Sequence, residues 1–181
     1  MEPMWRPGQS DASASKGLHA DSPAAIATVM TSDDPYQGHF TGREHKFAVR
    51  VYFEDTDFSG VVYHASYLRF MERARSDMLT CVGIVQSAAF AGGEGVYAVA
   101  ELSIKYHRPA RFDDALLVVS SVEQVRAATC VIHQRVMLGS EMLTTAKVVA
   151  AFLSPEGRPR RQPRDWIDKF TPLLPETKIA S

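Results

Sequence analysis

The sequence is poor in several features that mark whole classes of proteins. Its 181 residues include only two cysteines, Cys81 and Cys130, which lie far apart and lack the close Cys/His spacing of zinc sites. We expect both to be buried thiols, because an unpaired cysteine packs like a small hydrophobic residue. No apolar run approaches the roughly 18 residues of a membrane span, and no compact apolar signal core is present. We therefore expect a cytoplasmic protein.

An excess of positive charge is also missing. Lys and Arg number 20, Asp and Glu number 21, and the formal net charge is −1. Without a basic field the chain is not expected to hold nucleic acid or an anionic membrane, so any anionic ligand must meet local cations. Hydrophobic residues are 45% of the chain, which is enough to form the core of one domain.

Composition divides the chain into three parts. Residues 1–43 are rich in Ala, Ser, Gly, Asp and Pro and show no sustained apolar period. Such a segment cannot bury enough surface to offset the entropy of ordering it. We predict a disordered extension over residues 1–43, a folded domain over residues 44–175 and a tail over residues 176–181.

Hydrophobic periodicity predicts the elements of the domain. Apolar residues alternate from Phe47 to Phe53, as in a half-buried strand, and then recur at three- and four-residue steps across residues 67–82, as in an amphipathic helix. Segments rich in Val, Ile, Leu and Thr predict strands over residues 96–107, 115–125, 129–138 and 142–153. A short closing helix is expected near residues 165–174. Short breaks between consecutive strands indicate an antiparallel meander, hence an α+β fold with about five strands.

The strand over residues 96–107 is the candidate edge of this sheet. A meander that wraps one helix leaves an edge whose unpaired N–H and C=O groups invite pairing with a second chain. Simple alternation would turn one face of this strand toward the helix. That face carries Val96, Ala98, Ala100, Leu102, Ile104 and Tyr106.

The loop before the helix, DTDFSGVVYHAS, concentrates the polar residues. It fails as a calcium-binding EF-hand, because position twelve is Ser66 in place of a bidentate Glu and a strand precedes it. Asp55 is typical of a residue that caps a turn or a helix.

Asp57 is the candidate site residue of this loop. Gly60 lets a ligand approach the backbone closely. An apolar wall adjoins the carboxylate and consists of Val61, Val62 and Tyr63. An ionisable group on an apolar wall is a candidate for function.

The start of the predicted helix adds a second chemical feature. Near His64, about four backbone N–H groups lack partners within the helix, and the helix dipole is positive there. These groups can polarise a carbonyl that Asp57 attacks, or that water activated by Asp57 attacks. Together they outline an acyl-transfer site.

The loop and the helix after it together resemble the signature of a known family. The segment VRVYFEDTDFSGVVYHASYLRFMERAR resembles the signature of the hydroxybenzoyl-CoA thioesterase branch of the hot-dog superfamily, and most of all the Tol-Pal-associated acyl-CoA thioesterases. The similarity continues through RPARFDDALLV. It implies a hot-dog fold, in which a curved antiparallel sheet wraps one central helix. It also implies an acyl-CoA substrate, a homodimer or homotetramer, no metal or other cofactor, and a link to a cell-envelope complex.

The resemblance also assigns roles to residues. It makes Asp57 the catalytic carboxylate, as nucleophile or general base, and places the backbone N–H of His64 at the thioester oxygen. The side chain of His64 either orients substrate or water, or only packs. Arg126 matches a basic position that contacts the nucleotide of coenzyme A. Phe53 departs from the tyrosine expected in the motif, which removes a hydroxyl but leaves Asp57 unaffected.

Two residues on the helix complete the motif. Glu72 and Arg75 match the Glu-x-Ala-Arg pattern, which we interpret as ionic partners on the helix. The predicted activity is acyl-CoA hydrolysis. The alternatives are a hot-dog hydratase or dehydratase, which uses a His and carboxylate pair, and an acyl-CoA-binding accessory protein without turnover.

Overall fold

The structure, a computed structural model, describes residues 36–176. Most of the predicted extension, up to residue 35, and the tail from residue 177 lie outside the described residues. The described part contains six strands, three α-helices and two short 3-10 helices. In chain order they are β1 (His39–Thr41), β2 (Glu44–Arg50), η1 (Phe53–Asp55), α1 (His64–Cys81), α2 (Gln86–Ala91), β3 (Val96–Tyr106), β4 (Ala115–Val125), β5 (Thr129–Leu138), β6 (Glu141–Leu153), α3 (Arg164–Phe170) and η2 (Thr171–Leu173).

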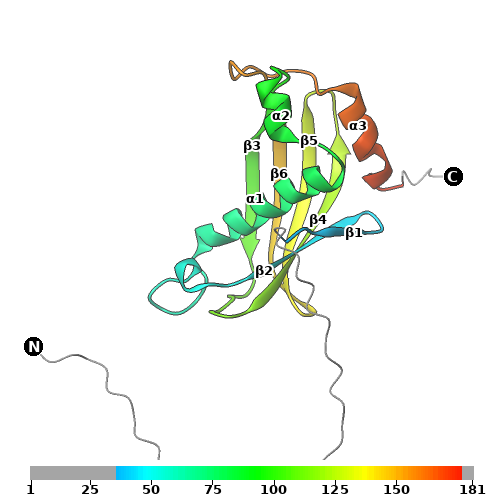
Figure 1. Ribbon diagram of the computed structural model, residues 1–181. Helices are drawn as coiled ribbons and strands as arrows, with labels where there is room; N and C mark the ends of the chain where they lie inside the picture. The colour runs from blue at the N-terminus through cyan, green and yellow to red at the C-terminus, as the bar shows by residue number, and fades with distance from the viewer. Residues whose placement is uncertain (1–35, 177–181) are drawn as a thin grey trace, which may run out of the picture. The chain divides into compact units, whose positions relative to one another are not determined.

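All six strands form one antiparallel sheet in the order β1-β2-β4-β5-β6-β3. The helix α1 lies across one face of this curved sheet (Figure 1). This is the predicted α+β hot-dog arrangement, with six strands where about five were predicted. The additional strand β1 precedes residue 44 and folds back on β2 through a turn in which Gly42 has a φ of 60°. No helix among residues 36–176 is long and apolar enough to cross a membrane.

The strands form a meander only in part. β4, β5 and β6 follow one another as predicted, but β3 pairs with β6 and not with its sequence neighbour β4. The reason is the path of α1, which crosses the sheet and, through α2, delivers the chain to the far edge (Figure 1). β3 is an edge strand, as predicted.

The prediction of which β3 side chains face the helix is wrong for the first half of the strand. The pairing of β3 with β6 shifts register between Val99 and Glu101, and an inserted residue reverses the alternation of side chains. Leu102 and Ile104 are half-buried, in agreement with the prediction. Before the bulge Tyr97 takes the inner position, with its ring centroid 5.3 Å from that of Phe152.

The core lies between α1 and the sheet. The buried face of α1 carries Ser66, Tyr67, Phe70, Met71, Ala74, Met78 and Leu79. Phe70 and Met71 are fully buried against the sheet, and burial of each large apolar side chain contributes about 1.5–3 kcal/mol. This packing fixes the position of α1, and therefore the position of its first turn.

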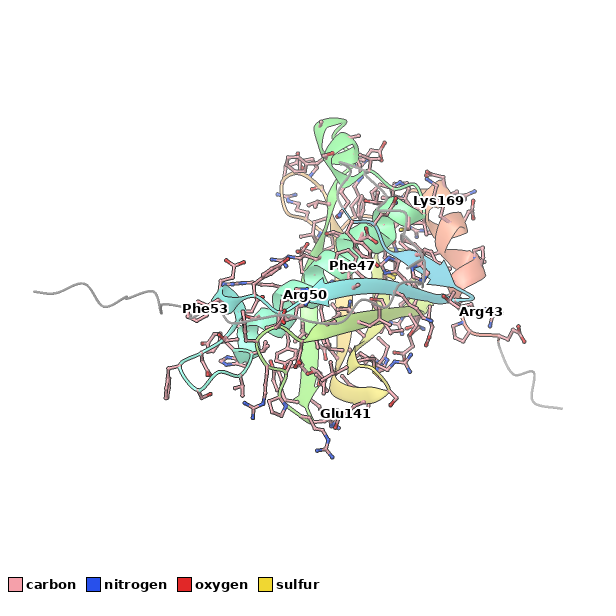
Figure 2. All side chains as sticks on the ribbon, turned by 60° about the horizontal axis from the view of Figure 1, so that its bottom comes forward. Arg43, Phe47, Arg50, Phe53, Glu141 and Lys169 are labelled. Carbon is pink, nitrogen blue, oxygen red and sulfur yellow. The ribbon has the colours of Figure 1, made fainter. Side chains whose placement is uncertain are left out.

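Phe53 does not continue the alternation of β2. The strand ends at Arg50, and Phe53 lies in the 3-10 helix η1 with 82% of its surface exposed. Figure 2 shows Arg50 on the strand and Phe53 beyond its end. The pattern from Phe47 therefore holds only to Val51, because the chain turns after that residue.

Candidate active site

The loop between β2 and α1 is held together by Asp55. Its side chain is buried, and Oδ2 accepts the backbone N–H of Tyr52 at 3.0 Å. Its carbonyl oxygen accepts the N–H of Tyr63 at 2.9 Å. Asp55 is thus a structural residue of the loop, as its predicted role in a turn requires.

Asp57 is presented differently, on a turn at the surface. Its Oδ1 accepts the backbone N–H of Ser59 at 2.8 Å and the Ser59 hydroxyl at 2.5 Å. These hydrogen bonds stabilise the carboxylate, and they lower the pKa of Asp57 below its ordinary value. The turn closes through the N–H of Gly60, which has a φ of 76° and donates to the Asp57 carbonyl at 3.0 Å. Asp57 is therefore ionised at neutral pH.

Ser59 is a site residue that the sequence reasoning missed. The signal available for it was the Asp-x-Ser spacing, because an aspartate readily accepts hydrogen bonds from the residue two positions later. It orients the Asp57 carboxylate within the turn.

The helix α1 begins at His64, and its first N–H groups point out of the helix end. Tyr63 precedes it without a side-chain cap. Within residues 36–176 the backbone N–H groups of His64 and Ala65 have no hydrogen-bond partner. Since the helix dipole is positive here, these two groups can stabilise an oxyanion.

The His64 side chain packs between aromatic rings. Its ring centroid lies 4.3 Å from that of Tyr63 and 6.5 Å from that of Tyr106. The Tyr106 hydroxyl donates to the His64 carbonyl at 3.0 Å, which ties the end of β3 to the first turn of α1. No hydrogen bond joins the side chains of His64 and Asp57 in the described part of the chain.

These features surround one open cavity of about 420 Å³. Five of the predicted site residues line it: Asp57, Val61, Val62, Tyr63 and His64. Gly60 lies beside them in the turn. The other wall comes from the first turns of α1 and from the end of β3 and the loop after it: Tyr67, Tyr106, His107, Arg108 and Pro109. The sequence reasoning missed the part of this wall that comes from β3 and the loop after it, because those residues lie far from the Asp57 loop in the chain.

Arg126 is not at this cavity. It lies in the β4–β5 turn, where its N–H donates to the Thr129 carbonyl at 2.8 Å. The strand register puts this turn at the same end of the sheet as the start of β3, whereas the cavity adjoins the end of β3 at Tyr106. Figure 1 shows the start of α1 and the β4–β5 turn at opposite ends of the sheet.

A second, smaller cavity of about 130 Å³ lies between α1 and the first half of β3. It is lined by Arg75, whose burial lowers its pKa, and by apolar side chains that include Tyr97 and Val99. The Arg75 guanidinium donates to Gln134 at 2.7 Å. Glu72 accepts a hydrogen bond from Ser76, one turn further along α1, and its negative charge partly offsets the lowering of the Arg75 pKa. The interpretation of Glu72 and Arg75 as ionic partners stays a prediction.

Comparisons with known proteins agree with this geometry. Residues 59–145 match the profile of the Thioesterase superfamily. The chain is 43% identical over 105 residues to the acyl-CoA thioesterase YbgC of Haemophilus influenzae. The aligned region covers 58% of this chain and 77% of that protein. It is 36% identical over 127 residues to the acyl-CoA thioester hydrolase YbgC of Escherichia coli O157:H7. Here the aligned region covers 69% of this chain and 94% of that protein.

A solved structure is similar over the same region. The probable thioesterase from Bartonella henselae is 40% identical, with a TM-score of 0.63 over 66% of this chain and 99% of that chain. Sequence and fold therefore agree: this chain belongs to the thioesterase superfamily.

Proposed function

We propose that this protein hydrolyses acyl-CoA thioesters to a free acid and coenzyme A. The observation that carries the proposal is the cavity at the start of α1, which is lined by both Asp57 and His64. Within residues 36–176 the N–H groups of His64 and Ala65 at this helix end have no hydrogen-bond partner. The relatives named acyl-CoA thioesterase support the choice of substrate.

In the proposed mechanism the thioester oxygen accepts hydrogen bonds from the N–H groups of His64 and Ala65. As the acyl carbon is attacked, negative charge develops on that oxygen and these donors stabilise it. Asp57 acts in one of two ways. It attacks the acyl carbon and expels the thiolate, leaving an anhydride that water hydrolyses, or it takes a proton from the water that attacks. Either route consumes one water and yields one acid and one thiol.

The remaining predicted site residues shape the cavity. Val61, Val62 and Tyr63 form an apolar wall beside the carboxylate, and Gly60 leaves the turn open to the ligand. The His64 ring packs against Tyr63 and Tyr106, which favours a role in shaping the wall over proton transfer. This packing disfavours the hydratase alternative, in which a His and carboxylate pair works as acid and base.

We further propose that the working unit is at least a homodimer that pairs β3 with β3 of a second copy. β3 is a long edge strand with unpaired backbone groups. Antiparallel pairing about a two-fold axis would set the Tyr106 end of one copy beside the Val96 end of the other. Arg126 of the second copy would then approach the cavity that contains Asp57, where it can meet the nucleotide phosphates.

A panel of acyl-CoAs with short, long, hydroxylated and aromatic acyl groups tests the function. We expect release of free thiol from at least one member, followed with a thiol reagent. Loss of enoyl absorbance without thiol release would instead identify a hydratase, and binding without either change would identify an accessory protein. A cytoplasmic location and a link to a cell-envelope complex remain predictions.

A further inference from the structure

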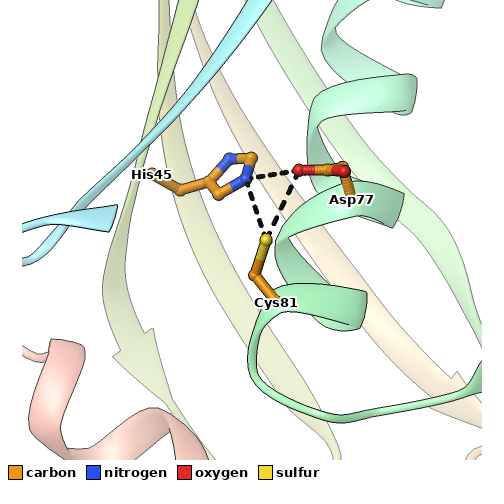
Figure 3. Close-up of side chains that lie close together, drawn as sticks. All are labelled: His45, Asp77 and Cys81. Atoms are coloured by element: carbon orange, nitrogen blue, oxygen red, sulfur yellow. Dashed lines mark hydrogen bonds and ion pairs between the residues drawn. The ribbon is translucent and has the colours of Figure 1, made fainter. Parts of the chain in front are cut away.

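A second group of chemically reactive side chains lies away from the proposed active site. His45 comes from β2, and Asp77 and Cys81 come from the last turns of α1 (Figure 3). Asp77 and Cys81 are four residues apart, so they lie on the same face of the helix. His45 is fully buried, Asp77 and Cys81 are partly exposed, and Cys81 is thus less buried than the sequence analysis predicted.

The three side chains converge on one point. His45 Nε2 lies 2.7 Å from Asp77 Oδ2, and Cys81 Sγ lies 3.6 Å from that oxygen and 3.8 Å from Nε2. Around a tetrahedral zinc ion with bonds of roughly 2.0–2.3 Å, such ligand atoms stand about 3.3–3.6 Å apart. The two distances to sulfur are close to this geometry. The distance from His45 Nε2 to Asp77 Oδ2 would have to widen by about half an ångström for a metal to replace the hydrogen bond.

This arrangement does not have the geometry of a nucleophilic triad. In a triad the carboxylate binds one nitrogen of the imidazole and the nucleophile faces the other. Here both Asp77 and Cys81 face Nε2 of His45. Nδ1 has no hydrogen-bond partner among the described residues, so with a metal on Nε2 the proton on Nδ1 would lack an acceptor, a cost that the ligand bonds must outweigh.

The surroundings suit a divalent cation. A neutral imidazole offers a lone pair to a metal ion, and His45 presents Nε2 to the same point as the other two side chains. One carboxylate and one thiolate would balance the two positive charges of the ion. The N–H of Gly38 donates to Asp77 Oδ2 at 2.9 Å and orients the carboxylate, as outer contacts of metal ligands do. A surface cavity of about 440 Å³ is lined in part by Asp77.

We propose that His45, Asp77 and Cys81 bind one divalent transition-metal ion of the zinc class, with water as the fourth ligand. Nitrogen, oxygen and sulfur together form a ligand set that zinc accepts. On binding, the Cys81 thiol becomes a thiolate and its proton goes to the solvent. The ion would connect β2 to the C-terminal end of α1, and so it is a structural clamp far from the chemistry of Asp57.

Cobalt(II) is the probe, because a cobalt–thiolate bond gives a charge-transfer absorption in the near ultraviolet. The tag-free full chain is stripped with a chelator and titrated with Co²⁺, and then with Zn²⁺ to displace it. We expect one Co²⁺ per chain and the thiolate absorption in the native protein. Cys81→Ser should lose the absorption and weaken Co²⁺ binding by more than roughly tenfold. Loss of a residue that only contacts a metal ligand already costs about that much, and Cys81 is proposed to be a ligand itself.

Cys130→Ser is the matched control, since Cys130 is the other cysteine of the chain and is buried away from the cluster. It should keep both the absorption and the affinity. As a second readout, Zn²⁺ should raise the thermal midpoint of the native protein but not that of Asp77→Asn. The proposal is overturned if the native protein shows no thiolate absorption, if Cys81→Ser retains it, or if only Cys130→Ser loses it.

Discussion

The two ends of the sheet differ in what they offer a ligand. The end at the start of α1 has an open cavity, a carboxylate on a surface turn and two N–H groups that find no partner in the described part of the chain. The end at the β4–β5 turn has a smaller cavity beside the half-buried Arg75 and carries Arg126. The first suits an acyl-transfer reaction, and the second supplies the cation predicted to meet coenzyme A.

One chain therefore does not bring both predicted features to one ligand. The extended coenzyme A molecule needs contacts at its thioester and at its phosphates. Two copies paired along β3 would supply these contacts from opposite ends, because antiparallel pairing reverses the direction of the second copy. The bulge near Ala100 interrupts the alternation in the middle of this edge and changes which side chains face the α1 side of the sheet.

The largest effect is expected at the reactive end. Asp57→Asn should lower turnover by about two orders of magnitude or more, because the amide neither attacks the thioester nor accepts a proton from water. The fold should persist, since the amide oxygen can still accept the bonds from Ser59. Steady-state thiol release and circular dichroism measure the two effects.

Glu54→Gln is the matched control for that change. Glu54 is an exposed carboxylate in the same loop, and the structure gives it no ion-pair partner among residues 36–176. It should keep nearly full activity. Near-full turnover by Asp57→Asn, or equal losses in both variants, would contradict the assignment of Asp57.

A smaller effect is expected at the opposite end. Arg126→Ala should raise the Michaelis constant for acyl-CoA about tenfold with little change in turnover, as loss of uniform binding does. A pantetheine thioester, which lacks the nucleotide, should be hydrolysed equally well by the variant and the native enzyme. Equal losses on both substrates would make Arg126 a structural residue of the β4–β5 turn.

The smallest effect is expected from Ser59. Its hydroxyl is the largest cause of the lowered pKa of Asp57, so Ser59→Ala should raise that pKa toward the ordinary value. Activity needs the carboxylate and is lost as the pH falls through its pKa. The acidic limb of the profile of kcat/KM against pH should therefore move to higher pH, with the neutral plateau nearly unchanged.

The control for this prediction is Ser87→Ala, at an exposed serine on α2. Its pH profile should superimpose on that of the native enzyme. A Ser59→Ala profile that also superimposes would show that the turn does not set the ionisation of the catalytic group.

Local patterns predicted much of the fold. The bounds of β4 and β5 agree with the prediction, and α1 ends within one residue of the predicted end, because their apolar periods are long and regular. β1 has only three residues, too few to show a period. The pairing of β3 with β6 was missed because it depends on the path of α1 across the sheet. The bulge adds one residue that no alternating pattern reveals.

The site was predictable to the extent that it lies in one segment. Asp57 and His64 belong to a single loop and helix start, so their proximity follows from the sequence. Tyr106 and Arg108 reach the same cavity from the end of β3, and only the folded chain brings them there. The cluster of His45, Asp77 and Cys81 was missed for the same reason, since its members come from β2 and α1.

The central claim is that each active site combines Asp57 of one copy with Arg126 of another. It is tested most directly by co-refolding equal amounts of Asp57→Asn and Arg126→Ala and measuring kcat/KM at low acyl-CoA. If the site is shared, each mixed dimer contains one fully native site, and about one quarter of all sites become native. We predict a rate well above the mean of the two parent variants. A rate equal to that mean would contradict the shared site, because it would show that Asp57 of one copy does not work with Arg126 of another.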